Sequence, residues 1–83
     1  MTNAGGWKEY LDGTVTPELR NYFEQALSGL VGVGYEPVSL LATQLVNGTN
    51  YKFLAVTKGE KVNKIIVINV NSNGEAKLVS IED

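Results

Sequence analysis

The pattern of apolar and polar positions predicts one amphipathic helix in the first half of the chain. From Leu19 to Leu30 the apolar residues recur at intervals of three and four positions, so they share one face of a helix. Thr16 is a favourable N-cap, and Pro17 suits the first helical position because its missing N–H has no intrahelical partner there. Glycines from position 29 onward end the segment. We expect this helix to lie across a sheet and to bury its apolar stripe, which comprises Leu19, Tyr22, Phe23, Ala26, Leu27 and Leu30.

Runs rich in β-branched, aromatic and aliphatic residues predict strands on both sides of the helix. Large apolar and charged residues alternate over Trp7–Leu11, which indicates a short half-buried strand with Trp7, Tyr10 or Leu11 partly covered. Tyr35–Pro37 is expected to be an extended connector, because Pro37 disfavours helix before it. The later strands are expected at residues 38–46, 49–57, 62–71 and 77–81.

Turn signals separate the predicted strands. Asn47-Gly48 is the preferred pair for a two-residue type I′ turn, in which both central residues have positive φ. Asn71–Gly74 carries a second Asn-Gly signal, and Asp12-Gly13 is expected to turn the chain before the helix. The chain is therefore predicted to form a single α+β domain over residues 1–83. One helix packs across an antiparallel sheet of four to five strands.

Composition narrows the functions that such a domain can have. A chain of 83 residues buries only roughly 60–65% of its unfolded surface, which leaves little room for an enclosed active site. The net charge is −2 and the seven basic residues are scattered, which argues against nucleic-acid binding. The sequence has no cysteine and no histidine, so thiolate nucleophiles and the commonest metal ligands are missing. We expect neither enzymatic activity nor a cofactor or metal.

The sequence also gives expectations about membrane association and cellular compartment. No stretch approaches the ~20 apolar residues that span a bilayer, so we expect no membrane partner. No charged leader followed by an apolar run is present at the N-terminus. A cytoplasmic protein is expected if Met1 is native, and a secreted one if a leader was removed.

The residues of the first predicted hairpin resemble those of a known inhibitor family. The spacing of Gln44, Val46 and Gly48, followed at once by Thr49-Asn50-Tyr51, resembles the first inhibitory hairpin of the cystatins, which block papain-like cysteine proteases. Gly5-Gly6 is similar in place to the glycine that follows the N-terminal trunk of that family. Thr16-Pro17-Glu18 resembles the entry to the helix in its stefin branch. The resemblance covers nearly the whole chain and implies a cystatin-like fold.

The function that this resemblance implies is reversible, competitive inhibition of papain-like cysteine proteases. A wedge made of an N-terminal arm and two hairpins enters the active-site cleft and is not cut. Val46 is expected to supply the apolar tip, Gln44 hydrogen bonds, and Gly48 the left-handed backbone. The implied protease-binding residues are Gly5, Gly6, Gln44, Leu45, Val46, Asn47, Gly48, Ser72, Asn73 and Gly74.

The chain departs from the family pattern in several places, one of which is Asn47, where the family usually has a small residue. Asn71–Gly74 lacks the Pro-Trp pair of many cystatins, so the second hairpin is expected to contribute little. Thr2-Asn3-Ala4 offers no large apolar side chain to a protease subsite. Asn47-Gly48-Thr49 is an N-glycosylation sequon, and a glycan there would block insertion of the hairpin.

The residues also allow an alternative to the inhibitor. Asn47-Gly48 is also what an ordinary meander uses as a plain turn, with Leu45 and Val46 as strand residues. The chain would then be a cystatin-fold binding or structural module, with an apolar patch elsewhere, for instance around Leu54 and Val56. In either case we expect a monomer with a tendency to form domain-swapped dimers, because Val46 in a tight bend favours opening of the hairpin.

Overall fold

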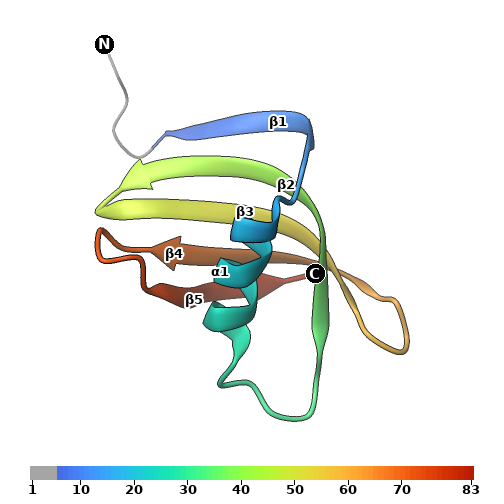
Figure 1. Cartoon of the computed structure of the whole chain (residues 1–83). Coiled ribbons are helices and arrows are strands. Elements are labelled where there is room, and N and C mark those ends of the chain that lie inside the picture. The colour runs from blue at the N-terminus through green and yellow to red at the C-terminus, as the bar shows by residue number, and fades with distance from the viewer. Residues whose placement is uncertain (1–5) are drawn as a thin grey trace.

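Short turns join the last four strands, so each strand pairs with its neighbour along the chain (Figure 1). The computed structural model describes residues 6–83, and of residue 12 the backbone alone. Its elements are β1 (Trp7–Gly13), α1 (Pro17–Leu27), β2 (Tyr35–Val46), β3 (Gly48–Thr57), β4 (Asn63–Val70) and β5 (Ala76–Glu82). The strands form one antiparallel sheet in the order β1-β2-β3-β4-β5. One helix on a five-stranded antiparallel sheet confirms the predicted α+β class.

The core lies between α1 and one face of the sheet (Figure 1). On β3, Phe53 and Ala55 are fully buried toward the helix, whereas Leu54 and Val56 are only half-buried on the other face. This alternation is what the period of two along a strand requires. The Phe23 ring of α1 meets the Phe53 ring edge-on, with centroids 5.2 Å apart and planes at 84°. The buried cluster consists of Phe23, Leu40, Phe53, Ala55, Ile66, Ile68, Val70 and Ala76.

Helix α1 begins where the sequence predicts and ends earlier. The Thr16 hydroxyl caps it by accepting a hydrogen bond from the Leu19 backbone N–H at 3.2 Å. The helix ends at Leu27, because Ser28 bonds back to the last turn and glycine follows. Leu30 therefore lies in the loop after the helix and is exposed, so its prediction as a core residue is wrong.

Strand β1 is longer and less regular than predicted. Its first three residues pair in register with β2, and the register then shifts before Gly13 reaches Leu40. A Cβ at Gly13 would overlap the Leu40 backbone, so the predicted turn position is instead a close strand contact that requires glycine. Of the three side chains among which a partly covered one was expected, Tyr10 is half-buried, whereas Leu11 is completely exposed.

Strand β2 begins at Tyr35, so the prediction of a connector at Tyr35–Pro37 is wrong. These residues pair with the end of β3, where Pro37 is buried opposite Ala55. The register shifts directly after Pro37, and β1 pairs with β2 only from Leu40 onward. Proline is tolerated here because this part of β2 has a single strand neighbour and an irregular pairing.

Replacing Phe53 by alanine is expected to destabilise the protein by about 3–5 kcal/mol, because it removes a fully buried ring and leaves a cavity beside Phe23. Urea unfolding followed by circular dichroism measures this. Leu11→Ala is the control, since that side chain is exposed and its removal is expected to change stability by less than about 0.5 kcal/mol. Equal losses in both variants would contradict the assigned core.

Candidate functional site

The segments that the sequence singles out for binding lie at one end of the sheet, on the left in Figure 1. Trp7, at the start of β1, pairs with Gln44 near the end of β2. Thr49, at the start of β3, pairs with Val70 at the end of β4. Gly6 precedes Trp7 and is exposed at this end, whereas Gly5 lies outside the described residues. The start of β1, the β2–β3 hairpin and the β4–β5 turn are therefore neighbours.

The tip of the β2–β3 hairpin differs from the predicted type I′ turn. Val46 pairs with Gly48 and Leu45 with Thr49, so Asn47 alone separates the strands. Gly48 has φ of 89°, and among the described non-glycine residues only Lys61 has a positive φ. Asn47 therefore does not adopt the conformation that a type I′ turn requires. Pairing with β4 decides the position at which β3 enters the sheet, and this register overrides the preference of the turn residues.

Gly48 lies where the first hairpin comes into close contact with the second. A Cβ built on it would lie 2.5 Å from the carbonyl oxygen of Val70 and 2.9 Å from Cα of Asn71. These atoms belong to backbone that cannot move aside as a flexible side chain can. The close approach and the left-handed φ both require glycine at this position. The tip of the first hairpin is thereby packed against the backbone that leads into the second.

The tip presents apolar side chains to solvent. Leu45 is 68% exposed and Val46 is 41% exposed. Neighbouring strand residues point to opposite faces, so the two side chains project from opposite sides of the ribbon. Neither belongs to the buried cluster. The plain-turn alternative, in which one of these side chains fills the core, therefore has no support at Leu45 or Val46.

Side-chain amides connect the base of this hairpin to β4. Asn50 donates from Nδ2 to Oε1 of Gln44 at 2.8 Å, and Asn69 donates from Nδ2 to Oδ1 of Asn50, also at 2.8 Å. Sequence reasoning assigned a role to Gln44 but missed Asn50 and Asn69. The signal that could have found them is asparagine within a strand, since this residue is depleted in strands unless its side chain has a specific partner.

The β4–β5 turn is closed by Asn71. Its Oδ1 accepts hydrogen bonds from the backbone N–H of Asn73 at 2.9 Å and of Glu75 at 3.0 Å. Its carbonyl oxygen accepts from Gly74 N–H at 2.9 Å. Ser72, Asn73 and Gly74 are exposed at the tip, as the sequence predicts. This tip is polar and small, so it adds hydrogen-bonding surface but little apolar area.

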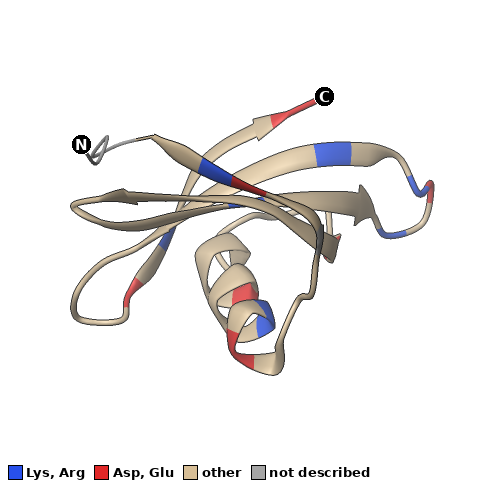
Figure 2. Ribbon diagram, turned by 90° about the horizontal axis from the view of Figure 1, so that it is seen from above, with Lys and Arg blue, Asp and Glu red and all other residues tan. Residues whose placement is uncertain are grey.

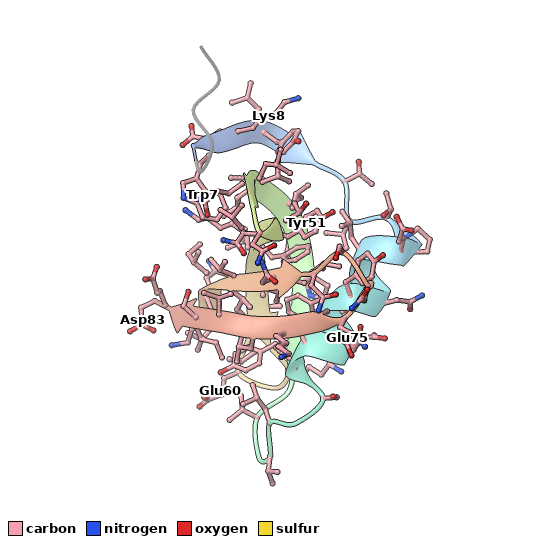
Figure 3. All side chains as sticks on the ribbon, turned by 90° about the vertical axis from the view of Figure 1, so that its left-hand side faces the viewer. Trp7, Lys8, Tyr51, Glu60, Glu75 and Asp83 are labelled. Carbon is pink, nitrogen blue, oxygen red and sulfur yellow. The ribbon has the colours of Figure 1, made fainter. Side chains whose placement is uncertain are left out.

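Trp7 and Tyr51 flank the base of the hairpin on opposite sides of the sheet (Figure 3). Lys52 places its Nζ 4.3 Å from the centroid of the Trp7 ring, a cation–π contact on the face away from α1. Tyr51 lies on the helix side and stacks beside Phe53, with ring centroids 6.5 Å apart.

Burial raises the pKa of the Tyr51 hydroxyl, and the nearby Tyr22 and Glu18 raise it further.

Within residues 6–83 no group of acidic side chains gathers in a way that could hold a metal ion. A cavity of about 210 Å³ does exist, but it lies at the far end of α1, lined by Phe23, Glu24, Leu27, Leu30, Val33, Gly34, Tyr35 and Lys58. No helix in the described part of the chain is long and apolar enough to cross a membrane.

Gly48→Ala is expected to destabilise the protein more than Gly59→Ala. Both glycines have a positive φ, 89° and 94°, which costs an alanine about 1–2 kcal/mol at either site. Only Gly48 faces backbone atoms, whereas a Cβ at Gly59 meets nothing within 4 Å. The overlap is expected to add about 1–3 kcal/mol, measured by urea unfolding of the two variants. Equal costs would mean that the hairpins are not in close contact.

Alkaline pH is expected to destabilise the protein in part through Tyr51. The raised pKa means that the folded state favours the neutral phenol. This stabilisation is complete below the ordinary tyrosine pKa of about 10 and is lost as pH rises through the folded value, because the unfolded chain ionises first. In Tyr51→Phe the fall in stability above pH ~10 should be shallower. Unfolding midpoints measured against pH test this, and parallel profiles for the two proteins would contradict it.

No protein-family model matches the chain, and the searches of curated proteins and of solved structures find no match either.

Proposed function

We propose that this protein is a reversible, competitive inhibitor of papain-like cysteine proteases with a cystatin-like fold. The observation that carries the proposal is the exposed apolar tip at Leu45 and Val46, flanked at the same end of the sheet by the start of β1 and by the β4–β5 turn. A narrow projection of this kind fits an extended cleft. The residues implied by the cystatin resemblance, from Gln44 to Gly48, form its centre.

The charge distribution supports insertion of the hairpin tips into a protease cleft without charge pairing. Figure 2 shows Lys and Arg spread over several elements, while the tips of both hairpins carry no charged residue. An uncharged tip loses little free energy when it is desolvated, whereas a buried unpaired charge is costly. Val46 and Leu45 would then supply apolar contact, and the exposed polar groups of Ser72 and Asn73 would line the rim.

Rigidity supports the proposal as well. Protease–inhibitor interfaces bury about 800 Å² per partner, and their affinity depends strongly on how little the inhibitor must be ordered on binding. Here Gly48 packs against Val70 and Asn71, and Asn71 closes the neighbouring turn with three hydrogen bonds. The proposed inhibitory loops are therefore restrained before they meet a protease. Inhibition needs no chemistry of its own, because the loops only fill the cleft.

A second candidate function is supported by one observation at the opposite end of the molecule. Leu30, Val31 and Val33 are exposed in the loop that follows α1, beside the cavity described above. Such a group of apolar side chains is consistent with a cystatin-fold module that binds a different partner. Leu54 and Val56, the alternative place for such a patch that the sequence suggests, are half-buried.

A papain inhibition titration tests the leading proposal. The native chain is expected to inhibit competitively, and Val46→Asp to weaken inhibition at least about tenfold, a loss of roughly 1.4 kcal/mol, because a carboxylate would be buried in the cleft. Val31→Asp is the matched control. It places the same charge on an exposed valine at the other end of the molecule and should leave inhibition unchanged. Absence of inhibition by the native chain at micromolar concentration would overturn the proposal and favour the second candidate.

A further inference from the structure

Asn69 makes the side-chain contact between β4 and the tip of the β2–β3 hairpin. Its Nδ2 donates one hydrogen bond to Oδ1 of Asn50 at 2.8 Å and a longer one to the backbone carbonyl oxygen of Asn47 at 3.4 Å. Asn47 is the single residue between β2 and β3. One side-chain nitrogen thus bonds to the hairpin at two places, its base and its apex.

Asn69 belongs to a polar row that crosses the whole sheet. The strand registers pair Trp7 with Gln44, Gln44 with Asn50, Asn50 with Asn69, and Asn69 with Lys77. Directly paired residues point to the same face, and Phe53 shows that the opposite face carries the helix. The row therefore lies on the face away from α1. Its three central members form a continuous amide chain in which each donates to the next, from β4 through β3 to β2.

Packing of apolar side chains contributes little to holding the hairpin tip in place. Leu45 and Val46 are exposed and make no contribution to the core. Beyond the pairs Trp7–Gln44 and Thr49–Val70 the tip is a two-stranded ribbon, and such a ribbon without a buried apolar face is marginally stable in water. Gly48 restrains one side of the tip by its approach to Val70, but glycine contributes no side-chain packing. In the part of the chain that the structure describes, the hydrogen bonds of Asn69 are therefore a side-chain restraint on the apex.

We propose that Asn69 is a positioning residue that holds the β2–β3 hairpin in one conformation through Asn47 and Asn50. The importance of this for inhibition rests on the proposed function, because that hairpin is the surface expected to enter the protease cleft. A loop fixed before binding loses less conformational freedom on binding, so its affinity is higher. Removing the restraint should weaken inhibition while the free energy of global unfolding changes little.

Two substitutions at Asn69 separate hydrogen bonding from charge. Asn69→Asp keeps the shape of the side chain but replaces the donor group by an acceptor, so neither bond to the hairpin can form. Asn69→Leu removes the donors without adding charge. Asn63→Asp is the matched control, because it makes the same change at an exposed position at the other end of β4.

The first measurement does not involve a protease. Amide hydrogen exchange of residues 45–49 is expected to be at least about fivefold faster in both Asn69 variants than in the native chain. Exchange in the centre of β4, at Ile66, should be unchanged, which would show that the opening is local. Asn63→Asp should match the native chain at the hairpin. Unchanged exchange of residues 45–49 in Asn69→Asp and Asn69→Leu would overturn the positioning role, whatever the inhibition assay gives.

The second measurement is the papain titration of the same variants. Inhibition is expected to weaken about fivefold or more in both Asn69 variants and to stay at the native level in Asn63→Asp. If hairpin exchange accelerates while inhibition by the variants equals that of the native chain, the link between positioning and inhibition is wrong. If hairpin exchange accelerates and even the native chain does not inhibit, the positioning role stands and the proposed function fails.

Discussion

The packing of α1 against the sheet, centred on the contact of Phe23 with Phe53, is the interaction on which the rest of the structure depends. It is the helix's main buried contact, because Phe23 is the one fully buried residue of α1. The helix also packs over β4 and β5 and covers apolar side chains that would otherwise face water. A chain of 83 residues has a single modest core, so loss of this contact would leave the hairpins without a scaffold.

The candidate site lies beyond this core and is held by different forces. At the hairpin end of the sheet the large apolar side chains are exposed, and order comes from backbone pairing, from the close approach of Gly48 to β4, and from the amides of Gln44, Asn50 and Asn69. Hydrogen bonds are directional, whereas apolar burial is not. An amide row can therefore fix the direction of a projecting loop and leave its apolar tip free for a partner.

The two ends of the molecule have different characters. The hairpin end is formed by the turns that join the strands (Figure 1), and it carries an exposed apolar tip beside a hydrogen-bonded polar turn. The other end has the cavity beside α1, bordered by the exposed Leu30 and Val33. A projecting end suits insertion into another protein's cleft, whereas a hollow end suits acceptance of a ligand group. These opposite shapes distinguish the inhibitor proposal from the second candidate.

The sequence by itself determined the helix, the strand faces and the uncharged character of the first hairpin, because these follow from local periodicity, capping and residue types. The residues left open whether Leu45 or Val46 points inward, and only the structure exposes both. Only the tertiary structure decided the register at Asn47, the strand pairing of Pro37 and the end of α1 before Leu30. It also decided that Gly48 meets Val70 and that Asn69 reaches Asn47 and Asn50. Each of these contacts joins residues of different strands, and their geometry depends on how β4 lies against β3. No local pattern encodes that relation, since a strand's residue types specify its two faces but not the residue that lies opposite each of them.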